Sequence, residues 1–267
     1  MSDYNYDSAN NYNYDNGYDT FNPGVNSYQG EADSNYYQNT EYTSPTGVEG
    51  LKTLATEKVV SKSFLFMMVA LVITAFAAMT TSPAVAKNMF SGGSFIIVFI
   101  VEMAIVFISN SAIKKNNAVL AGVLYTIYSF LTGIMLSLII YYYEGPSVVA
   151  TFFVTAGMFA TMAIIGLVTK KDLTGIGSLC LMGLIGVIIL GIVNMFLGNE
   201  GIDMGITVIA IVIFVGLTAY DTQKIKKMAA YSNGMTENSL ALFGAFQLYL
   251  DFINLFIRLL RIMGKRK

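Results

Sequence analysis

Apolar stretches of about 20 residues recur along this chain from Lys62 onward, separated by short polar segments. A helix of roughly 20 residues spans about 30 Å, which is the thickness of the hydrocarbon core of a bilayer. Of the 267 residues, 55% are hydrophobic and only 12% are charged, which is too apolar for an ordinary soluble domain. The sequence therefore predicts an all-α integral membrane protein.

Seven of these stretches are long enough to cross a membrane, and each is bounded by charged or turn-forming residues. The predicted spans are Ser63 to Thr81, Gly93 to Ala112, Ala118 to Tyr141, Pro146 to Val168, Ser178 to Leu197, Met204 to Tyr220 and Leu240 to Met263. The breaks between them read TTSPAVAKN, KKNN, YEGPS, TKKDLTG, GNEGID and KIKKMAAYSNGMTENS. Residues 51–267 are thus expected to form one seven-helix transmembrane domain.

The first 50 residues have a different composition, rich in Tyr, Asn, Asp and Gly, with no lysine or arginine. Such a segment has too little apolar surface to form a core, so we expect residues 1–50 to be a disordered acidic tail. It also lacks the basic start and apolar run of a signal peptide, so we expect it to stay with the mature chain. A solvated extension is the commoner meaning of such a tail, and docking of a partner is the alternative.

Lysine and arginine residues predict the orientation, because short cytoplasmic loops retain them. With a cytoplasmic N-terminus, the short outer loops carry only Lys87. The inner face then carries Lys52, Lys58, Lys62, Lys114, Lys115, Lys170, Lys171, Lys224, Lys226 and Lys227. The basic C-terminus RIMGKRK opposes this orientation, since seven crossings place it outside. We favour seven full spans in the cell membrane; the alternative is a last segment that dips in and returns to the inner face.

Residue types that are missing from the chain exclude several kinds of chemistry. The chain has no histidine, which excludes a histidine proton relay, a histidine-ligated metal and a Ser-His or Cys-His nucleophile. It also has no phosphate-binding glycine loop. An intramembrane aspartyl protease stays open, because Tyr220 and Asp221 supply its YD motif, although no GxGD motif is present. We predict no enzymatic activity, no cofactor and no nucleic-acid partner.

Ionisable residues at membrane depth are the candidate functional residues, because a lone charge there costs several kcal/mol and usually faces protein or water. They are Glu102 in the second span, Asp221 at the end of the sixth, and Asp251 and Arg258 in the seventh. The seventh span carries a single polar stripe, since its polar residues follow each other at steps of four, three, four and three. The stripe consists of Gln247, Asp251, Asn254, Arg258 and Arg261. A helix with one polar face and otherwise apolar faces is expected inside the bundle.

Asp251 needs a partner from another helix, because Arg258 is seven residues, or about 10 Å, further along the same helix. Asp221 is one candidate, provided that the sixth and seventh spans are offset along their axes. The alternative is that Asp221 pairs with Lys224, one turn further on. The spacing alone leaves both arrangements open.

The segment GLTAYDTQKIKKM, followed by ALFGAFQLYLDFINLFIRLLRIMG, resembles the signature of the transmembrane Bax-inhibitor-motif family, in a bacterial-type member. The resemblance runs from about Lys52 to the end of the chain and excludes the tail. It implies seven transmembrane helices, with two three-helix layers around a central C-terminal helix. It also implies that Asp221 and Asp251 form a proton-sensitive gate in a calcium-permeable leak pathway.

Further residues are assigned to this pathway by the resemblance or by their place on the stripe. Glu102 matches the acidic residue that the family places in its second helix, and Asn254 and Arg258 continue the stripe. Family members often carry an arginine about three turns after that acidic residue, able to lock onto the aspartates. This chain has Lys114 and Lys115 there, which can supply a point charge but not the bidentate fork of arginine.

Paired carboxylates suit a gate, since two of them in a poorly hydrated site do not ionise together cheaply and tend to share a proton. When both are ionised, Asp221 and Asp251 present oxygen ligands to a hard cation. The pair supplies at most four of the six to eight oxygens that calcium takes, so Thr218, Thr222, Gln223, Asn254, Glu102, carbonyls or water must supply the rest. Binding is expected to be weak, as a leak requires.

The sequence therefore predicts a pH-sensitive leak channel in the lipid bilayer, with calcium as the permeant ion. The alternative from another class is a non-conducting regulator that binds another membrane protein, such as a protease. A secondary transporter is a third reading, but the sequence shows no inverted repeat.

Overall fold

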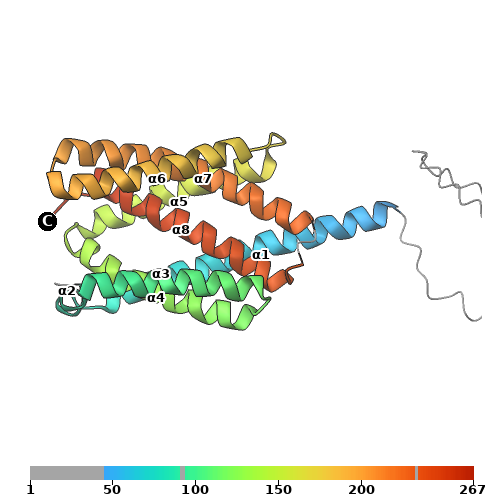
Figure 1. Cartoon of the computed structure of the whole chain (residues 1–267), viewed down its shortest axis with the longest axis horizontal. Helices are drawn as coiled ribbons and strands as arrows, with labels where there is room; N and C mark the ends of the chain where they lie inside the picture. Colours follow the sequence, from blue (N-terminus) through green and yellow to red (C-terminus); the bar gives the residue numbers. More distant parts are fainter. Residues whose placement is uncertain (1–44, 91–93, 232–233) are drawn as a thin grey trace, which may run out of the picture. The chain divides into compact units, whose positions relative to one another are not determined.

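The computed structural model describes residues 45–90, 94–231 and 234–267, so the predicted disordered tail lies outside the described residues apart from 45–50. The described part of the chain forms eight helices and no strand (Figure 1). These are α1 (Pro45–Thr80), α2 (Pro83–Phe90), α3 (Ser94–Lys114), α4 (Ala118–Tyr141), α5 (Gly145–Val168), α6 (Thr174–Leu197), α7 (Glu200–Ala230) and α8 (Glu237–Met263). All except α2 are long and apolar enough to cross a membrane, which confirms the predicted all-α, seven-helix fold.

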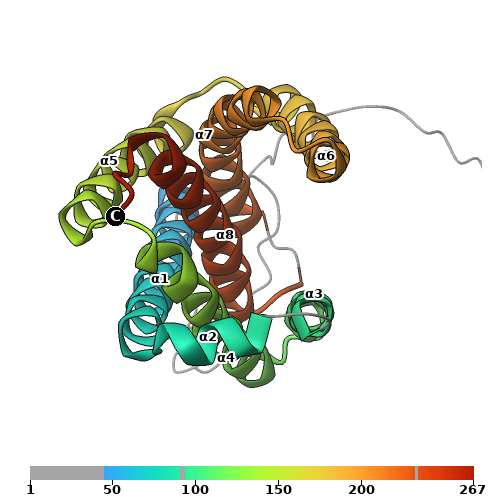
Figure 2. The same ribbon diagram turned by 90° about the vertical axis from the view of Figure 1, so that its left-hand side faces the viewer.

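Helix α8 lies at the centre of the bundle. Figure 2 shows α1, α3 and α4 on one side of it and α5, α6 and α7 on the other, and α8 packs against members of both layers. In its most apolar stretch 72% of α8 is buried, whereas no other spanning helix exceeds 44%. The predicted arrangement of two three-helix layers around the C-terminal helix is therefore confirmed.

The C-terminal helix runs without interruption from one end of the bundle to the other. At its start, Thr236 caps the helix by accepting from the Ser239 backbone N–H, and Glu237 forms ion pairs with Lys58 and Lys62 of α1. Beyond its end, the Lys265 carbonyl accepts a 2.9 Å hydrogen bond from the backbone N–H of Glu144, between α4 and α5. The last segment does not turn back on itself, so the re-entrant alternative is not found.

Two helices extend well beyond the predicted spans. Helix α1 begins at Pro45 rather than Ser63, and α7 continues from the predicted end at Tyr220 to Ala230. The extensions carry charged residues that are good helix formers, so the backbone stays helical where the apolar stretch ends. The first break also contains a helix that was not predicted, α2, which has Pro83 at its first position as helices tolerate. As a result, Asp221 lies inside α7 rather than at its end.

Close helix contacts within each layer depend on glycine. A Cβ atom placed on Gly133 of α4 would lie 2.5 Å from the Thr74 carbonyl oxygen of α1. On Gly166 of α5 it would lie 2.3 Å from the Ala219 carbonyl oxygen of α7. Small residues at such contacts let helix backbones approach each other, which is how membrane helices gain packing energy.

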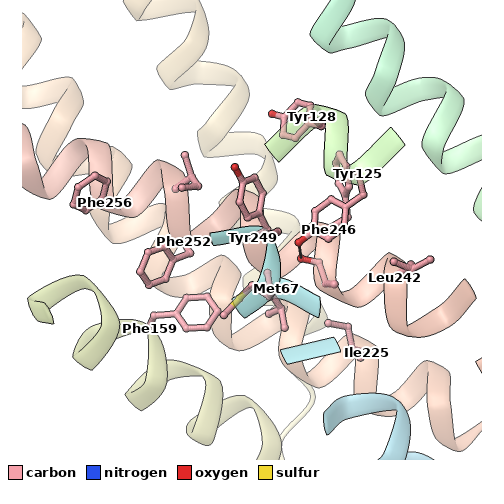
Figure 3. Packing of buried hydrophobic residues seen from close by; sticks show 14 of the residues in the cluster. Met67, Tyr125, Tyr128, Phe159, Ile225, Leu242, Phe246, Tyr249, Phe252 and Phe256 are labelled. Atoms are coloured by element: carbon pink, nitrogen blue, oxygen red, sulfur yellow. Dashed lines mark hydrogen bonds between the residues drawn. The ribbon is translucent and has the colours of Figure 1, made fainter. Parts of the chain in front are cut away.

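Aromatic packing on one face of α8 fixes its rotation about its own axis (Figure 3). Phe246 and Tyr249 pack against Tyr125 and Tyr128 of α4, with ring centroids 5.2 to 6.1 Å apart. The Tyr249 hydroxyl also lies 2.7 Å from the Thr74 hydroxyl of α1. Asp251 follows Tyr249 by two residues, so its side chain lies about 200° around the helix from that of Tyr249. The polar stripe of α8 therefore faces away from α1 and α4, toward α6 and α7.

Candidate ion pathway along α8

A cavity of about 700 Å³ follows the polar stripe of α8, and its other walls come from α6 and α7. Five of the residues that line it are the predicted stripe, namely Gln247, Asp251, Asn254, Arg258 and Arg261. From α7 the cavity receives three charged side chains, those of Asp203, Asp221 and Lys224. The wall formed by α6 is apolar. The structure thus brings most of the chain's membrane-depth charges to one side of α8.

Asp221 and Asp251 lie close enough for their carboxyl groups to interact, and both line the cavity together with Gln247. Both aspartates are buried, with 6% and 4% of their surface exposed. Asp251 Oδ2 has no hydrogen-bond partner among the described residues. Two buried carboxyl groups that face the same cavity do not ionise together cheaply.

The offset between α7 and α8 explains how the two aspartates meet. Asp221 lies nine residues before the end of α7, and Asp251 lies fourteen residues after the start of α8. These separations correspond to about 13 Å and 21 Å along the two helices. The extension of α7 to Ala230 supplies most of the depth that Asp221 needs to reach the level of Asp251.

Lys224 does not form an ion pair with Asp221 in the described part of the chain. Its ammonium group instead lies 5.7 Å from the ring centroid of Tyr220 and 5.4 Å from that of Phe243. It lines the same cavity as the aspartates, at the end where α7 leaves the apolar region. The geometry therefore favours the paired aspartates over an Asp221–Lys224 pair, and it places the Lys224 ammonium group in the same cavity.

The remaining residues of the YDTQ segment have structural partners. Thr222 donates to the Thr218 carbonyl one turn earlier at 2.7 Å. The Gln223 amide accepts from the Leu173 N–H at 2.9 Å and donates to the Lys171 carbonyl at 2.8 Å, so it holds the loop between α5 and α6. This amide is engaged and is not free to complete a calcium site.

The same loop is held by an exposed charge pair. Lys227 donates to Asp172 at 2.6 Å, and Thr174 donates to the same carboxylate through its hydroxyl at 2.6 Å. These hydrogen bonds, with that from Lys227 the largest contribution, hold the pKa of Asp172 well below its usual range.

Toward the C-terminal end of α8 the cavity becomes positively charged. The Arg261 guanidinium forms an ion pair with Asp203 of α7. Asn254 donates to the Leu250 carbonyl of its own helix at 2.8 Å. Arg258, one turn before Arg261, has no hydrogen bond or ion pair with any described residue and is only partly buried.

The structure places Glu102 away from the cavity. Its side chain is buried near Tyr128 and Tyr249, on the face of α8 opposite Asp251. Its Oε1 atom has no hydrogen-bond partner among the described residues. Glu102 is therefore separated from the aspartate pair by the body of α8, and in this arrangement it does not contribute to their site.

Lys114 and Lys115 are also not brought to the aspartates. Lys114 is the last residue of α3, and both side chains are exposed. The following Asn116 adopts a positive φ of 58° and bridges to the loop before α8, donating to Gly234 and accepting from the Thr236 N–H. In the described chain neither lysine contacts an aspartate.

Metal-binding capacity at the site is limited to the two aspartates and neutral oxygens. No cluster of three or more Asp, Glu, Cys or His side chains occurs among the described residues. Asp221 and Asp251 together offer at most four carboxylate oxygens, fewer than the six to eight that calcium takes. The arrangement suits transient contact with a cation rather than a tight site.

Two cavity residues were not identified from the sequence as members of the site. Asp203 lies in the GNEGID segment, which the sequence predicts to be a break between spans, and the spacing suggests Lys224 only as a partner of Asp221. The helical extension of α7 at both ends brings them into the cavity. The signal in the sequence is that Asp203 and Lys224 lie within about one helical turn of the predicted span Met204 to Tyr220.

Comparison with known proteins identifies the family. A family model described as "Inhibitor of apoptosis-promoting Bax1" matches residues 56–267. The chain belongs to this family. The Bax1-inhibitor family match covers the whole seven-helix unit except its first residues, and it confirms the resemblance found in the YDTQ and LYLDFINLFIRLLR segments.

Proteins similar to this chain come from several bacteria. The chain is 42% identical to "Inner membrane protein YbhL" of Escherichia coli K12 over 208 residues, which cover 76% of this chain and 89% of that protein. It is 40% identical over 224 residues to an "Uncharacterized protein" of Borreliella burgdorferi, covering 82% and 97% of the two chains. With seven apolar helices and a relative named as an inner membrane protein, the chain is an integral membrane protein.

Proposed function

We propose that this protein is a calcium-permeable leak channel of the cell membrane, with a cytoplasmic N-terminus and with Asp221 and Asp251 as its pH-sensitive gate. The observation that supports the proposal is that both carboxyl groups are buried and line the same polar cavity near the middle of α8. Ionisable residues at this depth are functional candidates by default, because nothing in the hydrocarbon core stabilises them.

The gate acts through the charge of the pair. When Asp221 and Asp251 share a proton, the hydrogen bond between them holds α7 against α8 and closes the pathway. When both are ionised, they repel each other and offer their oxygens to a cation. Calcium passes as the permeant ion and is not a resident cofactor, because the site has too few oxygens to hold it tightly.

Lys224 is better placed than Lys114 or Lys115 to act as the lock that the family resemblance implies. It lines the cavity and lies near both aspartates, whereas the other two lysines are exposed at the end of α3. In the proposed cycle, Lys224 leaves the Tyr220 and Phe243 rings and approaches the ionised pair. It then competes with the entering cation.

Calcium flux into liposomes tests the proposal directly. The purified full chain is reconstituted into liposomes that contain a calcium-sensitive dye, and flux is measured across a range of pH against protein-free liposomes. The proposal expects flux that depends on the protein and on pH. The alternative, a non-enzymatic regulator that binds another membrane protein and conducts nothing, expects no flux from the protein alone.

A further inference from the structure

Arg258 lines the cavity but has no hydrogen bond or ion pair with any described residue. Its neighbour Arg261 is neutralised by Asp203, and the two aspartates lie near Lys224. Asp251 is seven residues away, about 10 Å along the helix, which is too far for contact. A guanidinium near the end of a membrane-spanning helix that has no partner in the protein is available to bind an anion at the bilayer surface.

The wall opposite Arg258 is apolar and reaches the lipid-facing surface. It is formed by the second half of α6, whose residues Ile188 and Ile192 line the cavity and are also about half exposed. Helix α6 packs chiefly on α7, and Figure 2 shows it on the outside of its layer. The cavity therefore has a charged wall on α8 and an apolar wall continuous with the surface that faces lipid chains.

The depth of Arg258 matches the phosphate region of a bilayer. Helix α8 has 27 residues, or about 40 Å, which is close to the thickness of a bilayer including its headgroups. Arg258 lies five residues, or about 7 Å, before the end of α8, near the boundary between the hydrocarbon core and the headgroups. Its guanidinium reaches the phosphate level by extending toward the surface.

We propose that Arg258 and the apolar wall of α6 form a binding site for one anionic phospholipid of the leaflet at the C-terminal end of α8. The phosphodiester accepts hydrogen bonds from the Arg258 guanidinium, and an acyl chain lies along Ile188 and Ile192. A guanidinium matches a phosphate group in both charge and geometry, since it donates two parallel hydrogen bonds. The site concerns lipid binding and does not depend on whether the protein conducts calcium.

Native mass spectrometry of the purified full chain tests this site. The protein is incubated with phosphatidylglycerol and phosphatidylcholine of identical acyl chains, and the ratio of the two bound lipids is measured. Wild type is expected to prefer phosphatidylglycerol, and Arg258→Gln to lower this preference about tenfold or more, as loss of a charge-assisted hydrogen bond does. Arg266→Gln is the matched control, because it removes an exposed arginine at the same end of the protein.

Two further variants separate the parts of the site. Arg258→Lys keeps the charge and is expected to retain part of the preference, while Ile188→Trp fills the apolar wall and is expected to reduce binding of both lipids. These two variants carry the test if Arg258→Gln does not fold. Inorganic phosphate is the soluble competitor, and it is expected to displace little lipid because it lacks the acyl chain.

Several results overturn the proposal. The first is an Arg258→Gln protein that prefers phosphatidylglycerol as strongly as wild type does. The second is an Arg258→Lys protein with the wild-type preference, together with an Ile188→Trp protein that binds both lipids as well as wild type does. An equal loss in Arg266→Gln assigns the preference to general surface charge, which also overturns it. Complete displacement by inorganic phosphate makes the site one for a free anion rather than for a lipid.

Discussion

Replacing either aspartate of the pair by asparagine is expected to remove the pH dependence of calcium flux rather than to scale it. In the proposed gate the proton is shared between Asp221 and Asp251, so its loss belongs to the pair and not to one residue. Asparagine keeps the size of the side chain and its ability to donate a hydrogen bond, but it does not ionise. The variant therefore tests charge with little change in packing.

The size of the effect follows from the electrostatic repulsion between the two carboxylates when both are ionised. For two unit charges at a hydrogen-bonding separation of about 3 Å and an effective dielectric constant of about 20, the repulsion is roughly 5.5 kcal/mol. Each single substitution removes this whole interaction, because it leaves only one charge. The second substitution has no repulsion left to remove, so the double variant is expected to differ from the single variants by less than about threefold.

The assay is calcium flux into dye-loaded liposomes for wild type, Asp221→Asn, Asp251→Asn and the double variant, measured at a series of pH values. Asp172→Asn is the control, because Asp172 is an exposed carboxylate in the loop before α6 and does not line the cavity. It is expected to keep the wild-type pH profile. A wild-type profile in Asp221→Asn would refute the reasoning and leave Asp251 alone as the candidate gate.

Four other predictions concern topology, stability and the tail. A cysteine added after Lys267 in a Cys180→Ala background is expected to react with an impermeant thiol reagent on intact cells; protection until lysis would place both termini on the same side. Gly166→Ala is expected to destabilise the protein by about 1 to 3 kcal/mol through overpacking, measured by thermal unfolding in detergent, and an unchanged midpoint would contradict the close helix contact. The Asp172 carboxylate has a lowered pKa, so its contribution to stability is present above the unfolded value and is lost as pH falls; Asp172→Asn should therefore lower the unfolding temperature at neutral pH but not in acid. Deletion of residues 2–44 is expected to leave calcium flux intact in a well-folded protein, and loss of flux would favour a regulatory role for the tail.

The sequence predicts the bundle well because its strongest signals are local. Apolar length identifies the spanning helices, and the four-three spacing from Gln247 to Arg261 identifies the face of α8 that lines the cavity. The central position of α8 follows from the same spacing, since a helix with a charged stripe is stable in a membrane only when the stripe faces protein or water. These inferences need no knowledge of how helices are offset.

The composition of the site depends on the offsets and rotations of the helices relative to each other. A hydropathy pattern does not encode these. The contact of Asp221 with Asp251 depends on the extension of α7 to Ala230, which lies outside the apolar stretch. The position of Glu102 depends on the rotation of α8, which is fixed by the packing of Tyr249 against α4 and its contact with Thr74. Both depend on side-chain packing between segments that are distant in the sequence.

The charges along the cavity connect the proposed gate with the proposed lipid site. Asp203 and Arg261 cancel each other, which leaves Arg258, Lys224 and the aspartate pair. With one shared proton the pair carries one negative charge and the cavity one net positive charge, which repels a divalent cation. With both aspartates ionised the net charge is zero, and a phosphate at Arg258 makes it negative. A proton on the aspartate pair therefore makes the net charge of the cavity more positive, whereas a lipid phosphate at Arg258 makes it more negative. The two act at different places on the same helix.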